Sequence, residues 1–402
     1  MGGCVKDIVI IANFCRDFSE TDNGRFMYLC KDLSKGNRVE IITSDFGHSA
    51  KKRKSPLKHS WPFKITFLHE AGYKKNISIK RFFSHYKWGK EVAKYLDKRK
   101  KPDVIYCAVP SLTASLQSAK YCERKNVRFI IDIQDLWPEA FKLAFHVPMI
   151  SNIVFAPFTA YANGIYKRAD AICAVSKTYA DRAMSVNRKC SKSHVVFLGT
   201  KLATFDRYAK ENPVEKPQNE FWIGYCGTLG ASYNITIAID ALAVLAKRGI
   251  KVLKFIVLGD GERRNEFEQH AKELGVDCIF TGRLTYEEMC GWLVACDIAV
   301  NPIMHNAAGS IINKHGDYAA SGIPVLNTQE CKEYRDLVNE YKMGFNCQNG
   351  DAEALADKLQ LLIADDDLRF EMGRNARRCA EEKFDREHSY KELISTILED
   401  ES

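Results

Sequence analysis

The sequence predicts an α/β protein with two doubly wound parallel sheets, one in each half of the chain. Its 402 residues are enough for two domains of ordinary size. Short apolar segments alternate with helical segments, which is typical of parallel sheets built from β-α-β units. This alternation starts again after a polar segment that contains Pro213 and Pro217. We therefore expect two Rossmann-like domains, at 1–205 and 221–382, joined by a linker at 206–220.

The individual elements follow from the periodicity of apolar residues in each half. In the first half, the polar and basic segment 46–60 is expected to be a loop, and helices are predicted at 24–34 and 79–99. The predicted strands of this half are 7–14, 38–44, 63–69, 104–107, 127–133, 169–175 and 194–198. In the second half, the predicted strands are 221–225, 253–258, 278–281, 298–302 and 324–326. The predicted helices there are 234–247, 262–274, 285–295, 311–321 and those within 355–395.

The composition is that of a soluble globular protein. Hydrophobic residues make up 46% of the chain and the mean hydropathy is -0.28. No run of about 18 or more uncharged apolar residues occurs, so no membrane-spanning helix is predicted. The first ten residues include Lys6 and Asp7 and do not resemble a signal peptide. We therefore expect a cytoplasmic protein.

The 14 cysteines form no C-x-x-C pair. They are predicted to be reduced thiols that serve as small hydrophobic side chains. A zinc site is not predicted, because the spacing of its ligands is missing.

Charge is distributed unevenly along the chain. Residues 1–200 hold 35 Lys and Arg against 17 Asp and Glu, whereas residues 201–402 hold 24 against 34. A basic first half predicts an anionic partner for that half. The candidates are an anionic membrane leaflet, a lipid-linked diphosphate and a nucleic acid. No recognisable nucleic-acid module is visible, so nucleic acid is not the expected partner.

One segment in the last third of the chain has the features of a phosphate site. A strand is followed by a loop, then by a predicted helix at 311–321 that opens after Ser310 and stops at Gly322. Serine is a good N-cap, and helix N-termini bind anions through free backbone N–H groups. On such a helix Ser310, Lys314 and Asp317 share one face. These groups would suit a nucleotide-sugar pocket, with Lys314 near a phosphate and Asp317 near sugar hydroxyls.

This segment resembles the donor-site helix of family 4 retaining glycosyltransferases, which have the GT-B fold. In that family, two glutamates eight residues apart flank the helix before a Gly-x-Pro-Val sequence. Alignment on the Gly-Ile-Pro-Val sequence at 322–325 places Asp317 at the second acid and Gly309 at the first glutamate. The Ser-x-x-Asn-Lys pattern, here Ser310, Asn313 and Lys314, resembles a subgroup that assembles bacterial surface polysaccharides.

The resemblance implies a retaining GT-B enzyme with two Rossmann-like domains that face each other across a cleft. Its donor would be a nucleotide-diphosphate hexose or N-acetylhexosamine, and its acceptor a lipid-linked or oligosaccharide chain in capsule, O-antigen or exopolysaccharide synthesis. A helix at 383–402 would cross back to the first domain. No cofactor and no metal ion is expected, since no Asp-x-Asp pair is evident. An inner-membrane surface is the expected site of action, where the enzyme would be peripheral.

Three further loops of the second half are predicted to meet the donor. Small residues follow the first strand of that half and would let the backbone approach a phosphate. The two other loops, a Gly-x-Gly turn and a Gly-Arg-Leu segment, resemble family segments near the nucleotide. Ordinary turns and a surface arginine are the alternatives. The predicted donor-binding residues are Gly227, Thr228, Leu229, Gly259, Gly261, Arg283, Leu284, Gly309, Ser310, Ile311, Asn313, Lys314 and Asp317.

The acceptor side is predicted in the first half. An acid-rich loop with Trp137 follows a buried strand, and Asp135 and Glu139 are candidates for acceptor binding or proton handling, together with Asp317 as catalytic residues. The alternative is an N-cap with a packed tryptophan. Gly24 and Arg25 correspond to the family's N-terminal loop near donor and acceptor.

The segment 141–166 is strongly apolar and aromatic. Pro148 and Pro157 are expected to prevent one straight helix. Core packing is one interpretation, and a surface for a bilayer or a polyprenyl chain is the other. For the whole protein, the alternatives to a glycosyltransferase are a GT-B nucleotide-sugar epimerase and a non-catalytic, basic nucleic-acid-binding protein.

Overall fold

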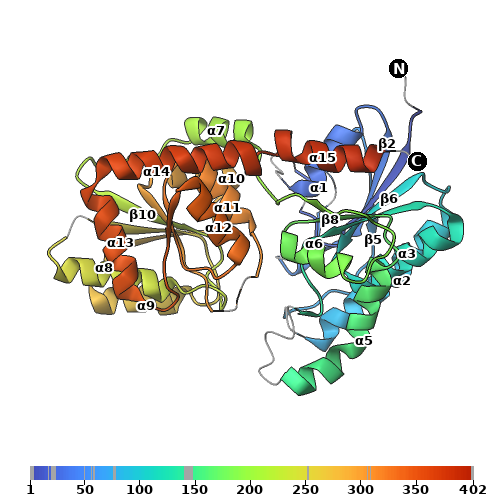
Figure 1. Ribbon diagram of the computed structural model, residues 1–402, viewed down its shortest axis with the longest axis horizontal. Coiled ribbons are helices and arrows are strands. Elements are labelled where there is room, and N and C mark those ends of the chain that lie inside the picture. Colours follow the sequence, from blue (N-terminus) through green and yellow to red (C-terminus); the bar gives the residue numbers. More distant parts are fainter. Residues whose placement is uncertain are drawn as a thin grey trace. The chain divides into compact units, whose positions relative to one another are not determined.

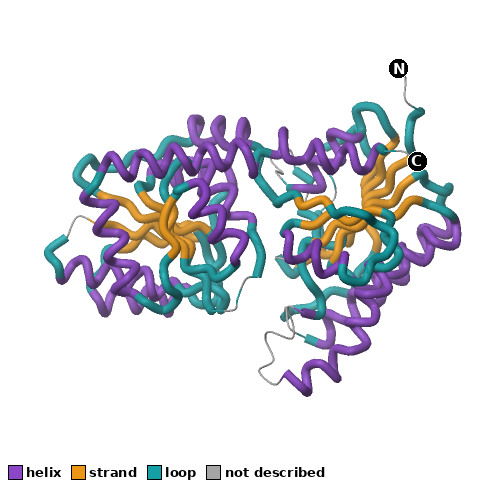
Figure 2. Tube along the Cα trace, in the orientation of Figure 1, coloured by secondary structure: helices purple, strands orange, loops and turns teal. Residues whose placement is uncertain are grey.

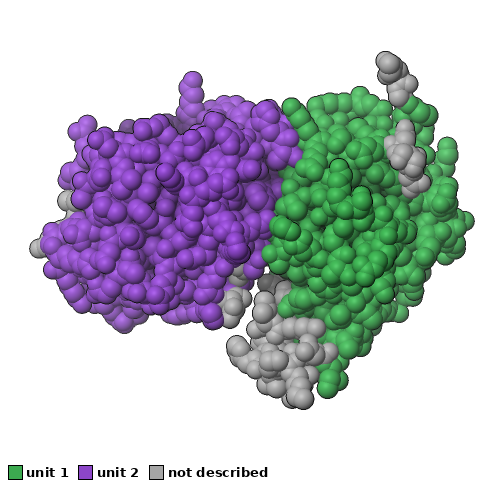
Figure 3. Space-filling model, viewed as in Figure 1, with its two compact units in different colours: residues 1–196, 390–402 green, residues 197–389 purple. Residues whose placement is uncertain are grey.

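The chain divides into two compact units, which Figure 3 distinguishes by colour. Unit 1 comprises Met1–Val196 and Tyr390–Ser402, and unit 2 comprises Phe197–Ser389. The computed structural model describes residues 4–16, 18–19, 24–48, 50–55, 57, 59–75, 78–139, 148–250, 253–305, 307 and 309–399, with the backbone alone at 148–152.

Unit 1 contains a seven-stranded sheet whose neighbouring strands all run parallel. The strand order is β5-β2-β1-β6-β7-β8-β9, so β1 lies between β2 and β6 and the winding reverses at β1. This is the predicted doubly wound arrangement. The strands are β1 (Asp7–Ile11), β2 (Arg38–Ser44), β5 (Lys64–Leu68), β6 (Val104–Val109), β7 (Arg128–Ile133), β8 (Ala171–Ala174) and β9 (His194–Val195).

The segment predicted as a loop at 46–60 contains a short antiparallel ribbon. It pairs β3 (Phe46–Gly47) with β4 (Lys52–Arg53). Strands of two residues carry no periodic pattern, which is why the sequence did not indicate them.

Helices cover the sheet of unit 1, as Figure 1 shows. Three residues of α15, Tyr390, Leu393 and Ile397, lie in the same core as the apolar residues of α1. On the α2 side, α2 packs against α3 and α3 against α5. Gly89 permits the first of these contacts, because a Cβ atom there would lie 2.7 Å from the backbone nitrogen of Ala114. The helices are α1 (Arg25–Leu33), α2 (Ile79–Lys98), α3 (Leu112–Lys125), α5 (Pro148–Tyr166), α6 (Lys177–Met184) and α15 (Arg386–Leu398).

Helix α5 differs from the expectation that its prolines would interrupt it. Pro148 is its first residue, a position where the missing N–H costs no hydrogen bond. Pro157 lies inside the helix and is exposed. The first part of the apolar segment, 141–147, lies outside the described residues.

Unit 2 has a six-stranded parallel sheet with the order β12-β11-β10-β13-β14-β15. Counted along the chain, this is the 3-2-1-4-5-6 order of dinucleotide-binding folds. The tube view in Figure 2 shows its strands as a twisted central layer between helices. The strands are β10 (Phe221–Cys226), β11 (Leu253–Leu258), β12 (Cys278–Gly282), β13 (Ile298–Asn301), β14 (Val325–Asn327) and β15 (Gly344–Asn346).

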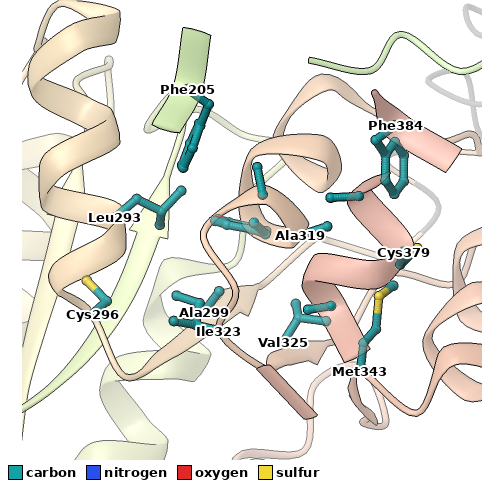
Figure 4. Close-up of a cluster of buried hydrophobic side chains, with 14 of the residues drawn as sticks. Phe205, Leu293, Cys296, Ala299, Ala319, Ile323, Val325, Met343, Cys379 and Phe384 are labelled. Atoms are coloured by element: carbon teal, nitrogen blue, oxygen red, sulfur yellow. The ribbon is translucent and has the colours of Figure 1, made fainter. Parts of the chain in front are cut away.

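Two hydrophobic cores cover the two faces of this sheet. Along β11, Phe255 and Val257 belong to one core while Ile256 and Leu258 belong to the other, as the alternation of a strand requires. One core includes side chains of α8 (Ile235–Lys247), α9 (Arg264–Leu274) and α13 (Ala352–Ala364). The other includes side chains of α7 (Leu202–Glu211), α10 (Tyr286–Ala295), α11 (Asn313–Ala320), α12 (Lys332–Tyr341) and α14 (Asp366–Cys379). Figure 4 shows the second core, where Ala319 of α11 lies among side chains of the neighbouring elements.

Helix α7 occupies the start of the segment predicted as a linker. Its residues Leu202, Phe205 and Tyr208 are buried in the core of unit 2. Their spacing is helical, and the prolines that indicated a linker come only after the helix ends. Among the described residues, no helix is long and apolar enough to cross a membrane.

Candidate active site

The carboxyl ends of β10 and β13 mark the point where the strand order of unit 2 reverses. Open α/β sheets bind their ligands in the crevice at such a point. β10 ends at Cys226 and leads into the glycine loop, whereas β13 ends at Asn301 and leads towards α11. The predicted donor helix therefore follows one of the two strands that form the crevice.

Helix α11 begins at Asn313, two residues later than the sequence predicts, and its N-cap is Ile312 rather than Ser310. The Nδ1 atom of His315 accepts a hydrogen bond from the Ile312 N–H at 3.3 Å. The Ser310 carbonyl accepts a hydrogen bond from Nε2 of Gln329 at 2.8 Å, which holds that residue outside the helix. Of the three residues predicted to share one face of this helix, only Lys314 and Asp317 therefore lie on it.

Lys314 is a buried cation in the first turn of α11. Its side chain is 8% exposed, and within the described part of the chain its Nζ has no hydrogen-bond partner. The ammonium group lies 4.2 Å from the ring centroid of Tyr225 and 4.1 Å from that of Tyr233. Burial lowers the pKa of Lys314 to about 7. The two rings provide cation–π contact but no anion, so a phosphate placed here would restore the full positive charge.

The glycine loop after β10 is folded closely around this lysine. Gly227 has a φ of +148°, and a Cβ atom on it would lie 2.5 Å from Nζ of Lys314. Gly259 also has a positive φ, and its Cβ would lie 1.8 Å from the carbonyl oxygen of Gly227. A Cβ on Gly261 would lie 2.3 Å from the carbonyl oxygen of Leu229. The two glycine-containing loops therefore touch through their backbones, and both need glycine for steric reasons.

Asp317 lies one turn after Lys314 and is held by a tyrosine. The Tyr286 hydroxyl donates to Oδ1 of Asp317 at 2.8 Å and lies 2.7 Å from the hydroxyl of Thr200. Desolvation is the main cause of the rise in the pKa of the Cys226 thiol to about 12, to which Asp317 adds and against which Lys314 acts. Both charged groups of α11 thus lie near the end of β10.

The other predicted donor residues fall into two groups. The side chains of Leu229 and Ile311 are buried in hydrophobic cores, so only their backbones can meet a ligand. The remaining residues are exposed or partly exposed, and a Cβ atom on Gly309 would meet nothing within 4 Å. This second group includes Thr228, Arg283, Leu284, Gly309 and Asn313.

Three residues at this site were not predicted from the sequence. Tyr225 and Tyr233 enclose the lysine, and Tyr286 binds the aspartate. The two tyrosines flank the glycine loop in the sequence, a signal that was available. Tyr286 lies far from α11 along the chain, and nothing local connects it to Asp317.

In unit 1, the predicted acid-rich loop contains two carboxylates with different surroundings. Nε1 of Trp137 donates to Oδ2 of Asp135 at 3.0 Å, and burial raises the pKa of Asp135. Glu139 accepts a hydrogen bond from Nε of Arg182 at 2.6 Å and forms an ion pair with it. Asp135 is therefore the better placed of the two for proton handling.

Arg25 holds elements of unit 1 together through buried hydrogen bonds. Its Nε and Nη2 donate to the two carboxylate oxygens of Asp132 at 2.8 and 2.9 Å, and Nη1 donates to the Tyr390 hydroxyl at 3.1 Å. The side chain is buried, so its guanidinium ties α1 to β7 and α15 and is not presented to an acceptor. Gly24 is the N-cap of α1 and is partly exposed.

The described residues contain no group of three or more His, Cys, Asp or Glu side chains that could hold a metal ion. At the candidate donor site, Lys314 and the backbone N–H groups at the start of α11 provide positive charge.

Part of the chain is similar to known glycosyl transferases. The family described as "Glycosyl transferases group 1" matches residues 206–379. An α-1,4-N-acetyl-D-galactosaminyltransferase of Campylobacter jejuni, which acts on a diNAcBac-PP-undecaprenol-linked glycan, is 25% identical over 193 residues. That match covers 45% of this chain and 49% of the relative. The capsular polysaccharide biosynthesis glycosyltransferase CapM of Staphylococcus aureus is 25% identical over 185 residues, which are 44% of this chain and 46% of that protein.

The chain spans about half the length of these curated relatives. Its fold extends the similarity to nearly the whole chain. The crystal structure of Anabaena HepE in complex with UDP superposes with a TM-score of 0.70 at 16% identity and covers 97% of this chain and 99% of HepE. The predicted α/β architecture is confirmed: the chain has the GT-B fold, and its residues 206–379 match the group 1 glycosyl transferases.

Proposed function

We propose that the protein is a retaining glycosyltransferase of family 4 type that transfers a sugar from a nucleotide-diphosphate sugar to a lipid-linked saccharide. The reaction would serve capsule, O-antigen or exopolysaccharide synthesis. The similarity to a galactosaminyltransferase with an undecaprenol-linked substrate and to a capsule enzyme supports this choice. So does the fold shared with HepE.

The observation that carries the proposal is the buried Lys314. A cation that is 8% exposed and without a hydrogen-bonded partner in the described residues is unfavourable in the unliganded protein. It stands at the N-terminus of α11, next to a loop that glycine alone can form. A diphosphate would supply the missing anion to both the lysine and the helix N-terminus.

In this mechanism unit 2 holds the donor. Lys314 and the α11 N–H groups would stabilise the negative charge that develops on the departing diphosphate. Asp317, oriented by Tyr286, would accept hydrogen bonds from sugar hydroxyls of the nucleotide. No enzymic nucleophile is assigned, so the acceptor hydroxyl would attack from the same face that the diphosphate leaves. Asp135 would bind the acceptor or take up its proton.

No metal ion is required by this scheme, because Lys314 and the helix N-terminus supply the positive charge. The enzyme would work at the cytoplasmic face of the inner membrane, where its basic unit 1 would meet anionic lipid headgroups.

The test is a set of thermal shifts with UDP, GDP, ADP, dTDP and CMP in excess EDTA. A ligand at a hundredfold excess over its Kd stabilises the folded state by about 2.7 kcal/mol. A shift with one nucleoside diphosphate would identify the base of the donor and would support metal independence. If none of the five nucleotides gives a shift, the donor site is refuted. Release of free nucleotide that depends on an added glycan acceptor would separate a transferase from an epimerase.

A further inference from the structure

An apolar groove lies on unit 1. It has a volume of about 360 Å³, within the range of small-molecule sites. Its walls come from α2, from the start of α3 and from α5, helices that lie side by side in Figure 1. Six aromatic side chains dominate the lining: Phe82, Phe83, Tyr86, Trp137, Phe158 and Tyr161.

The groove continues into an exposed apolar strip. Ile79, Phe83 and Tyr86 line it and are 88%, 55% and 45% exposed. Contiguous exposed apolar side chains of this size usually mark a binding site. Phe83 and Tyr86 project from successive turns of α2, so they form one side of a channel rather than scattered contacts.

The lining of the groove also includes His85 of α2 and Trp137 from the loop that follows β7. His85 is 4% exposed and stacks on Trp137 with an interplanar angle of 4°. Neither of its ring nitrogens has a hydrogen-bond partner among the residues that the structure describes. The Arg81 guanidinium lies 4.5 Å from the ring centroid of Trp137. Oε1 of Glu70 lies 3.8 Å from Nε2 of His85, beyond hydrogen-bond distance. A buried imidazole without a hydrogen bond, next to a guanidinium, indicates a polar ligand group near these residues.

Charge along α2 favours an anionic ligand. From Ile79 to Lys90 the helix has four cationic residues, Lys80, Arg81, Lys87 and Lys90, and no acidic residue. The ammonium groups of Lys87 and Lys90 lie 4.5 and 5.5 Å from the ring centroids of Phe83 and Tyr86. The groove therefore combines aromatic walls with a positive border, which matches an amphiphile that has an apolar chain and an anionic head.

We propose that this groove binds the isoprenoid chain of the lipid-linked acceptor, with the adjoining diphosphate next to Arg81 and His85. The inference rests on the proposed function and adds to it the part of the chain that recognises the lipid. Isoprenoid chains pack well against aromatic rings, and the diphosphate has the charge that Arg81, Lys87 and Lys90 complement. The diphosphate would also place the attached glycan near Asp135, whose carboxylate binds Trp137 at the groove.

The experiment measures binding of farnesyl diphosphate to the full chain by calorimetry, with farnesol and inorganic diphosphate as partial probes. The groove variant combines Phe83→Ser with Tyr161→Ser, two side chains that are 55% and 39% exposed, so the fold should be retained. The matched control is Phe370→Ser, an aromatic residue of α14 that is 59% exposed. UDP thermal shifts on every variant report independently on unit 2.

We expect the groove variant to raise the Kd for farnesyl diphosphate at least tenfold, while the control changes it less than twofold. A double variant Lys87→Gln and Lys90→Gln should weaken farnesyl diphosphate and leave farnesol unchanged. The UDP shift should stay the same in all of them. If UDP does not bind but farnesyl diphosphate does, the proposed function fails and the groove assignment stands.

Three results would overturn the assignment. The first is equal farnesyl diphosphate affinity in the wild type and the groove variant, or no binding to either. In the second, the wild type does not bind farnesyl diphosphate but binds anionic vesicles that contain no prenyl diphosphate, and the groove variant does not bind these vesicles. This result would make the groove a contact with the bilayer. The third is a dimer in sedimentation that the groove variant abolishes, which would assign the groove to a second copy of the chain.

Discussion

Replacing Lys314 by methionine tests the donor site most directly. Methionine keeps an unbranched side chain of similar length but removes the charge, so the packing between Tyr225 and Tyr233 is largely preserved. The variant should be more stable than the wild type without nucleotide and should bind a nucleoside diphosphate more weakly.

The size of the stability change follows from the pKa of Lys314, which falls from 10.5 to about 7 on folding. One pKa unit corresponds to about 1.4 kcal/mol, so at pH 8 the folded state loses roughly 3 kcal/mol by holding this side chain in its neutral form. Lys314→Met removes this cost but also removes the cation–π contacts with Tyr225 and Tyr233. We therefore expect the variant to be more stable than the wild type by about 1–3 kcal/mol.

The sign of the pH dependence is fixed by the same shift. Between pH 7 and pH 10.5 the unfolded chain binds a proton at Lys314 that the folded chain does not. The destabilisation caused by Lys314 is therefore largest and constant below pH 7, decreases as the pH rises to 10.5 and is absent above it, so the free energy of unfolding of the wild type rises with pH in this window. Lys314→Met should lack this rise.

Binding of a nucleoside diphosphate should return Lys314 to its protonated, positively charged form. A bound diphosphate raises the pKa of Lys314, so the wild type should take up nearly one proton per UDP at pH 8, and its affinity should fall as the pH rises above about 7. Lys314→Met should take up none and bind UDP about 10- to 150-fold more weakly, the equivalent of a lost hydrogen bond to a charged group.

The assay is calorimetry at pH 8 in two buffers with different ionisation enthalpies, together with urea unfolding from pH 6 to pH 10. Lys332→Met is the matched control, because its side chain in α12 of unit 2 is 86% exposed. Equal UDP affinity and equal proton uptake in the wild type and Lys314→Met would refute the role of Lys314. The nucleoside diphosphate that gives the largest thermal shift replaces UDP if the base differs.

Three further substitutions test other parts of the structure. Gly227→Ala should displace the Lys314 ammonium, because its Cβ would lie 2.5 Å from Nζ, and thermal shifts should show weaker nucleotide binding; Gly230→Ala, whose Cβ meets its nearest atom at 3.7 Å, should bind normally. Gly309→Glu should change the free energy of unfolding by less than about 0.5 kcal/mol in urea titrations, because its Cβ meets nothing within 4 Å; a larger loss would contradict this open position. Arg25→Met should cost about 3–5 kcal/mol in the same titrations by leaving Asp132 buried without its cation, and a loss below 1 kcal/mol would contradict the buried pair.

Most strands of the two sheets could be predicted because their signal is local, but the three-residue strand β15 was not predicted. The segment 253–258 alternates between two buried faces, and the structure has β11 at the same residues. Boundaries that depend on distant contacts were less predictable. The helix predicted at 311–321 starts at Asn313, because the side chain of Gln329 holds the carbonyl of Ser310 outside it. The prolines at 213 and 217 indicated a linker, but they did not reveal that α7 precedes it.

The sequence by itself determined the α/β class, the two doubly wound sheets and the position of Lys314 near the start of a helix. These features depend on the order of apolar and polar residues along a few turns or strands. The tertiary structure alone decided that Tyr225 and Tyr233 enclose the lysine, that Tyr286 binds Asp317, and that Arg25 is neutralised by Asp132. Burial and charge pairing arise from residues far apart in the chain, so a local pattern identifies a cation but does not show whether folding leaves it with a partner.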